Sequence, residues 1–273
     1  MTTQTVDSQG LSSGNPALNQ NIVDEYMTPG AAAVVSAPRT MTVIGTSLKT
    51  AFLLAVLIAG GAWGWASATT PVAADAGSGY ANTTVTIPGG FWLASFGALF
   101  VGIFAALNPR LVAVLGTIYA VLQGYCLGAI SAMFDAQTEG IVGAAIIATV
   151  AVFVAALFFY LTGIIKPTRK MAFGVAAGIG GLCLLYLFVG VMSLFNWGWL
   201  YSDQFQMIGV VVSLIAVALA ALSLTLDFGR IEAGRNAGAP KMMEWYSAWS
   251  LMVTLIWLYI TLLRLLAFFA RNR

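Results

Sequence analysis

The sequence predicts an all-α integral membrane protein, a bundle of seven transmembrane helices, on three observations. Of its 273 residues, 60% are hydrophobic and only 8% are charged, whereas soluble domains carry about 25% charged residues. Seven segments are apolar and close to the roughly 20 residues that a membrane-spanning helix needs. Lysine and arginine also concentrate in alternate connecting segments, as expected when each apolar segment crosses the membrane.

Short polar connections separate the segments that we expect to span the membrane. These segments are 48–67, 91–107, 111–134, 140–165, 171–195, 207–228 and 245–269. Only the tripeptide NPR separates the second from the third, so these two form a helical hairpin. The connection 68–90 is polar and contains Gly and Pro, and we expect an irregular backbone there. Close helix packing is indicated by pairs of small residues four positions apart: Gly60 and Gly64, Gly124 and Gly128, and Gly174 and Gly178.

The chain divides into a tail, residues 1–40, and a transmembrane domain, residues 41–273. The tail is rich in Ser, Thr, Asn, Gln, Gly and Pro without a sustained period, so we expect it to be disordered. No basic stretch followed by an apolar core opens the chain, and the first apolar helix is expected to serve as the targeting signal. With the N-terminus in the cytoplasm, nine lysines and arginines fall in inside segments, whereas the outside loops hold only acids. Arg271 and Arg273 at the C-terminus are the exceptions, and Arg264 lies within the last helix. This arrangement predicts a cytoplasmic tail and an external C-terminus.

Composition also excludes several classes of function. The chain has no histidine, which excludes zinc sites with histidine ligands and catalysis by a histidine base. Any proton sensing would therefore depend on a buried carboxylate. Cys126 and Cys183 lie within apolar runs and do not form a disulfide framework. There is no paired-carboxylate motif, no cysteine beside a base, no nucleotide loop and no basic run interleaved with aromatic residues. We therefore expect no enzymatic activity, no cofactor, no metal site and no nucleic-acid partner.

Asp227, in the stretch "SLTLDFGRIEAG", is the most informative polar residue, because no charged residue occurs from Met207 to Leu226. It is either an interfacial carboxylate paired with Arg230 one turn on, or a carboxylate kept inside the bundle for a function. Gln123, in the middle of the third helix, needs a hydrogen-bonding partner on another helix. Arg264 is expected to extend toward the outer headgroups.

A family resemblance bears on this choice. The segment 226–266, "LDFGRIEAGRNAGAPKMMEWYSAWSLMVTLIWLYITLLRLL", resembles the last two helices of the bacterial branch of the transmembrane Bax inhibitor motif family, and of its actinobacterial members above all. Segments 14–18, 108–135 and 162–173 support it in the same order. The resemblance implies a last helix enclosed by the other six and a place in the bacterial cytoplasmic (inner) membrane. It also implies a pH-sensitive calcium leak, closed when two cytoplasm-proximal aspartates share a proton and opened when both ionise.

The family pattern is incomplete in this chain. The resemblance places the aspartate of the sixth helix at Asp227, but the aspartate of the seventh falls on Thr254. Three further acids of the family pattern fall on Gln123, Gly229 and Thr261. Thr254 and Thr261 share one helix face, and such hydroxyls often bond back to their own helix. A lone Asp227 can still titrate, whereas calcium prefers several oxygen ligands with carboxylates among them.

The sequence therefore favours a Bax-inhibitor-type membrane protein that acts as a weak pH-sensitive cation (calcium) leak gated near Asp227. In this interpretation Thr254 is the hydrogen-bond partner of Asp227, Gln123 lines the path and Glu244 is a carboxylate at the cytoplasmic mouth. Arg230 and Arg235 are candidate counter-ions. The alternative is a non-conducting regulatory or stress-tolerance protein that binds other membrane proteins, such as a membrane protease. The partners expected are the lipid bilayer, calcium ions or protons, and other membrane proteins.

Overall fold

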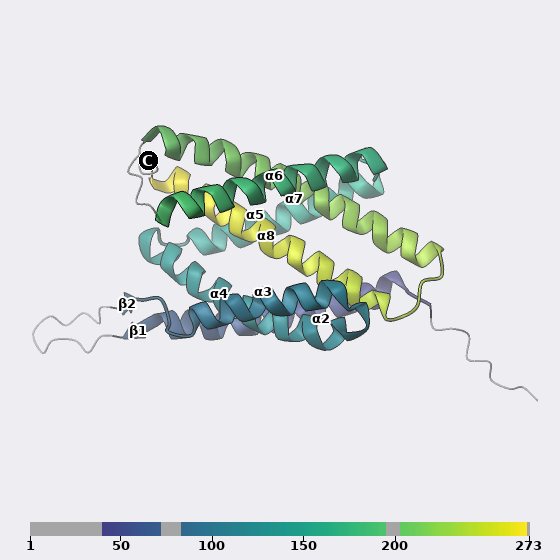
Figure 1. Ribbon diagram of the computed structural model, residues 1–273, viewed down its shortest axis with the longest axis horizontal. Coiled ribbons are helices and arrows are strands. Elements are labelled where there is room, and N and C mark those ends of the chain that lie inside the picture. The colour runs from purple at the N-terminus through teal and green to yellow at the C-terminus, as the bar shows by residue number, and fades with distance from the viewer. Residues whose placement is uncertain (1–39, 72–82, 195–202, 272–273) are drawn as a thin grey trace, which may run out of the picture. The chain divides into compact units, whose positions relative to one another are not determined.

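A computed structural model describes residues 40–71, 83–194 and 203–271, which form a bundle of seven long helices. The predicted tail lies outside these residues except for Thr40. The helices, labelled in Figure 1, are α2 (Val43–Ala68), α3 (Phe91–Leu107), α4 (Val112–Gln137), α5 (Ile141–Leu161), α6 (Arg169–Leu194), α7 (Asp203–Asn236) and α8 (Met243–Arg271). Six of them are long and apolar enough to cross a membrane, and α3, with 17 residues, is shorter. The length of α3 is about the lower limit for a membrane span. All seven described helices therefore agree with the predicted all-α membrane fold, which is confirmed.

The last helix lies at the centre of the described bundle. Figure 1 shows α8 running between α2 and α4 on one side and α5 and α7 on the other, and these four helices supply most of its packing. Met252 and Ile256 belong to a buried cluster with residues of α2 and α4. Leu251 and Leu258, on another face of the same helix, belong to a cluster with residues of α5 and α7. α3 packs on α4 and α6 on α7, so these two helices lie further from the centre.

The closest approach between helices is the crossing of α2 and α4. A Cβ atom on Gly128 would lie 1.9 Å from the carbonyl oxygen of Gly61, and one on Gly64 would lie 2.0 Å from that of Tyr125. The small-residue prediction is therefore confirmed for these helices, whose backbones touch because no side chain intervenes. It is wrong at Gly174, where a Cβ atom would meet nothing within 4 Å.

One connection differs from the sequence-based expectation, and another agrees with it. The segment 68–90, expected to be irregular, contains two short antiparallel strands, β1 (Thr69–Pro71) and β2 (Thr83–Val85). Their β-branched threonine and valine residues favour extended backbone, which explains the pairing. The α3–α4 hairpin is confirmed, with a 3₁₀ turn η2 (Pro109–Leu111) at the predicted place.

Helix α7 is longer than the sequence predicted, because it continues to Asn236 instead of ending near residue 228. Its 34 residues span about 51 Å, well beyond the roughly 30 Å of a bilayer core. Asp227 therefore lies within the helix, nine residues before its end, and not at the helix edge.

Candidate functional site

Asp227 is held by side chains of the neighbouring helix. Its residue is 5% exposed, and its carboxylate lies at the interface of α7 with α8. The hydroxyl of Thr254 donates to Oδ2 at 2.7 Å, and the hydroxyl of Ser250 donates to Oδ1 at 3.1 Å. Ser250 and Thr254 are four residues apart, so one face of α8 presents both donors. The predicted pair of Asp227 and Thr254 is thus in contact, and the carboxylate faces the bundle.

Of the two candidate counter-ions, only Arg230 is near this carboxylate. Its guanidinium lies 3.5 Å from Asp227 Oδ1, and its side chain is 69% exposed. A charge pair with so much solvent access and so long a distance contributes little to stability. Arg235 is also exposed and forms no ion pair with a described residue. The carboxylate is therefore held mainly by hydroxyl groups.

A further polar group lies one helical turn from Asp227. The Oγ atom of Ser223 is buried and has no hydrogen-bond partner among the described residues. Because residues four apart on a helix lie on the same side, Ser223 extends the polar strip that Asp227 begins on α7. A buried hydroxyl without a partner is costly, and such groups often bind water or an ion. The interface of α7 and α8 thus offers a short row of oxygen atoms to a proton, a water molecule or a cation.

Gln123 is half-buried on α4, and no hydrogen bond joins it to another described residue. Its spacing from Ala120 and Leu127, which both belong to the buried cluster around α8, places it on the face of α4 that packs on α8. The structure does not bring it into contact with Asp227. Its role in lining a path stays a prediction.

Two other positions where the family resemblance implies acids have local explanations. A Cβ atom on Gly229 would lie 2.5 Å from Cγ of Pro167, so the proline before α6 occupies the space that a side chain would need. Thr261 is buried, and its hydroxyl donates to the carbonyl oxygen of Trp257 at 2.7 Å. Neither position adds a charge to the interface of α7 and α8.

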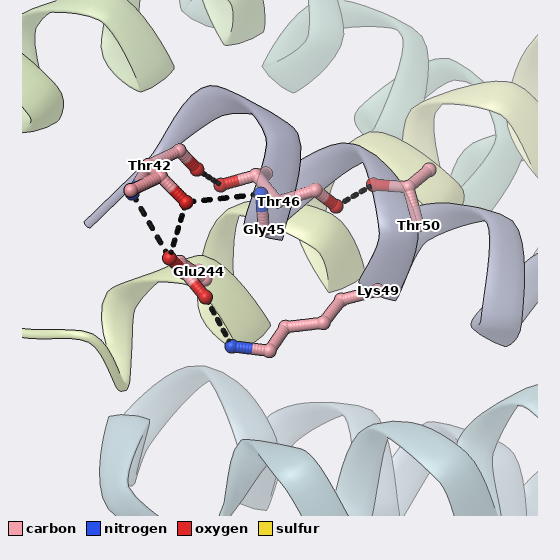
Figure 2. Close-up of polar contacts among 6 residues, drawn as sticks. All are labelled: Thr42, Gly45, Thr46, Lys49, Thr50 and Glu244. Carbon is pink, nitrogen blue, oxygen red and sulfur yellow. Dashed lines mark hydrogen bonds and ion pairs between the residues drawn. The ribbon is translucent and has the colours of Figure 1, made fainter.

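Glu244, expected from the sequence as a carboxylate at the cytoplasmic mouth, is fully buried, with 0% of its residue exposed. Figure 2 shows its carboxylate, on the first turn of α8, pointing at the beginning of α2. Oε1 accepts the backbone N–H of Thr42 at 2.9 Å and the Thr42 hydroxyl at 3.0 Å, and Oε2 forms an ion pair with Lys49. Gly45 makes this approach possible, since a Cβ atom there would lie 2.5 Å from Oε1.

The electrostatic setting of Glu244 explains why a buried carboxylate is tolerated here. It lies at the N-terminal ends of two helices, α2 and α8, where unpaired N–H groups and the helix dipole favour negative charge. The ammonium group of Lys49 also lies 5.2 Å from the centroid of the Trp245 ring, within range of a cation–π contact. Glu244 therefore fastens α2 to α8, and its role at a cytoplasmic mouth stays a prediction.

The sequence reasoning did not identify Ser250 and Lys49 as partners in these sites. Ser250 could have been found from its spacing, because it precedes Thr254 by one helical turn. Lys49 gave no such signal, since its partner Glu244 is 195 residues away in the sequence. Among the described residues, no group of three or more His, Cys, Asp or Glu side chains could hold a metal ion.

Comparison with known proteins agrees with this architecture. The model of the family described as "Bax inhibitor 1 like" matches residues 5–271, nearly the whole chain. No curated protein gave a significant match. A family model that extends over all seven helices and both polar sites establishes the classification: the chain is a multi-pass membrane protein of the Bax inhibitor 1-like family.

Proposed function

We propose that this protein is a weak, pH-sensitive cation leak, with calcium among the ions it passes, gated at Asp227. The observation that supports it is the buried carboxylate held by Ser250 and Thr254 on the neighbouring helix. Ionisable groups at membrane depth are costly, and they commonly mark a path for ions or protons. One carboxylate and a few hydroxyls give a cation some of the oxygen ligands that calcium prefers, enough for passage and too few for tight binding.

The proposed gate depends on the protonation of one carboxylate. When Asp227 is ionised, its negative charge attracts a cation into a region of low dielectric constant, where electrostatic interactions are strong. When it is protonated, this attraction is lost, and the path is closed to cations. The leak should therefore increase as pH rises. We place the protein in the bacterial cytoplasmic membrane, in the actinobacterial branch, with its N-terminus in the cytoplasm and its C-terminus outside, and we assign it no enzymatic activity.

The first test is Asp227→Asn in liposomes that report calcium entry between about pH 5 and pH 8. We expect the wild-type flux to rise with pH and the variant flux not to depend on pH. At high pH the variant should pass at least about tenfold less calcium, which corresponds to about 1.4 kcal/mol in free energy. Asp135→Asn is the matched control, because Asp135 accepts the N–H of Gly140 in the turn between α4 and α5. A variant that keeps the wild-type flux curve would clear Asp227 of a gating role.

A second test removes one hydroxyl donor without changing the size of the side chain. Thr254→Val takes away the 2.7 Å hydrogen bond to Oδ2 and so withdraws support from the ionised carboxylate. A hydrogen bond to a charged group contributes about 1.5–3 kcal/mol, so we expect the midpoint of the flux curve to move up by about one pH unit. Thr261→Val is the control, since that hydroxyl bonds only to its own helix. Equal shifts in the two variants would contradict the assignment.

One observation favours a second function, that of a non-conducting regulatory protein that binds other membrane proteins. No second carboxylate of the described chain faces Asp227, whose neighbours are two hydroxyls and Arg230. Without a second acid, repulsion between two carboxylates cannot drive the gate. Liposome flux separates the two functions, because a wild-type protein that gives no flux above that of empty liposomes at any pH would exclude the leak.

A further inference from the structure

A polar cavity lies about ten residues beyond Thr254 along α8, and Asp227 is not part of its lining. Its volume is about 680 Å³, within the range of small-ligand sites. It is lined by the last turn of α4, the first turns of α7 and the last two turns of α8. The polar part of the lining is formed by Gln137, Thr138, Ser213, Arg264 and Arg271. No described lining residue is a carboxylate, so Arg264 makes the lining suitable for an anion.

Arg264 supplies the main argument. Its guanidinium Cζ lies 5.3 Å from the centroid of the Tyr186 ring on α6, within range of a cation–π contact. An arginine carries five N–H donors in a planar fork. No hydrogen bond or ion pair joins them to any other described residue. Arg264 therefore has N–H donors to offer to a ligand in the cavity.

The position of Arg264 along the helix makes such open donors costly. α8 has 29 residues and Arg264 is seven residues past its middle, about 10 Å along the axis. The hydrocarbon core extends roughly 15 Å from its centre, so this arginine belongs to the outer part of the core or its edge. Charged side chains at that depth reach for an opposite charge or for the headgroup region.

The rest of the lining provides room and polar contacts. Gly209 and Ser213, one turn apart on α7, are small and face the cavity. Ser213 is buried, and Gln137 and Thr138 at the end of α4 carry further donors. Two acids are adjacent in the sequence to lining residues, Asp135 beside Phe134 and Glu139 beside Thr138. The Asp135 carboxylate accepts the N–H of Gly140, and neither acid forms an ion pair with Arg264. No described acid therefore neutralises Arg264.

From this geometry we infer that the cavity between the ends of α4 and α8 and the beginning of α7 binds a phosphate group, with Arg264 as its principal ligand. The planar fork of a guanidinium group matches two oxygens of a phosphate group, which makes arginine well suited to this ligand. The group is the headgroup phosphate of an anionic phospholipid or a free inorganic phosphate ion. This inference does not depend on ion conduction at Asp227.

The test uses the full-length chain in a neutral detergent, titrated with phosphatidylglycerol, with phosphatidylcholine and with inorganic phosphate. Native mass spectrometry counts bound lipid, and thermal unfolding reports binding of either ligand. We expect phosphatidylglycerol to be retained, Arg264→Gln to weaken its binding about tenfold and Arg264→Lys to give an intermediate loss, because lysine keeps the charge but not the fork. Arg110→Gln is the matched control, since Arg110 is exposed and lies outside the cavity.

The three titrations separate the two sources of the phosphate group. Stabilisation by phosphatidylglycerol that inorganic phosphate does not compete away assigns a lipid, and saturation by inorganic phosphate alone assigns the free ion. The melting temperature of each variant without ligand shows that it is folded before its binding is compared. Equal binding by wild type and Arg264→Gln, or an equal loss in Arg110→Gln, would overturn the inference.

Discussion

Gly128→Ala is expected to prevent α2 and α4 from packing at their observed separation. The new Cβ atom would lie 1.9 Å from the carbonyl oxygen of Gly61 and 2.8 Å from the backbone nitrogen of Trp65. Both contacts are with backbone, so no side chain can rotate away and the two helices must move apart. Overpacking in a core costs about 1–3 kcal/mol, and a clash between two backbones belongs at the upper end of that range or beyond it.

The measurement is thermal unfolding of the purified protein in detergent, and a loss of roughly 10 °C is expected if about 3 kcal/mol is lost. Gly64→Ala should behave alike, because its Cβ atom would lie 2.0 Å from the carbonyl oxygen of Tyr125. Gly180→Ala on α6 is the control, since a Cβ atom there meets nothing within 4 Å. It should leave stability unchanged or raise it slightly, because alanine favours helix over glycine by about 1 kcal/mol. A Gly128→Ala protein as stable as this control would contradict the crossing.

Glu244→Ala is the second substitution with a large expected effect. It removes an acceptor from the backbone N–H and the hydroxyl of Thr42, and it leaves Lys49 without its partner in a site where the lysine side chain is 17% exposed. Breaking a buried pair by deleting one member costs about 3–5 kcal/mol. Because Lys49 is partly exposed, we expect about 3 kcal/mol, measured as a lower melting temperature.

Matched variants separate the charge of Glu244 from its capping role. Glu244→Gln keeps an acceptor for Thr42 but not for Lys49, so it should lie between wild type and Glu244→Ala. Adding Lys49→Met to Glu244→Gln should recover part of the loss, because no unpaired ammonium group remains, and a double-mutant cycle then gives the coupling. Glu139→Ala, an exposed acid near the opposite end of the bundle, should change nothing. Additive effects of the two substitutions would show that the ion pair contributes no stability.

Much of the fold follows from the sequence because it is governed by local properties. The length of an apolar run determines whether a helix can cross the membrane, and the seven predicted segments agree with α2 to α8 to within a few residues at most ends. The exception is the end of α7, where residues 229–236 continue the helix although four of them, Arg230, Glu232, Arg235 and Asn236, are polar. Hydropathy marks where a helix leaves the lipid, and it carries no information on where the helix stops.

The same distinction between local and long-range information applies to the two polar sites, those of Asp227 and Glu244. Asp227 and Thr254 could be paired from the sequence, because the family resemblance supplied their relation. Glu244 could not, since an acid beside a polar turn is usually exposed. What buries it is the beginning of α2, 202 residues earlier in the chain, together with the space left by Gly45. Contacts of that sequence separation depend on how helices assemble, which a hydropathy pattern does not specify.

The touching backbones of α2 and α4 have a mechanical consequence. Because no layer of side chains separates these two helices, they are expected to move as one rigid unit. Glu244 attaches the beginning of α8 to this unit. The backbone N–H of Met41 also bonds to the carbonyl oxygen of Ala239 at 2.8 Å, which anchors the turn before α8. Gly238 lies in the same turn, with a φ of 64° that suits glycine, and its N–H donates to the carbonyl oxygen of Arg235. The beginning of α8 is thus held to the unit of α2 and α4 at two points, Glu244 and the hydrogen bond between Met41 and Ala239.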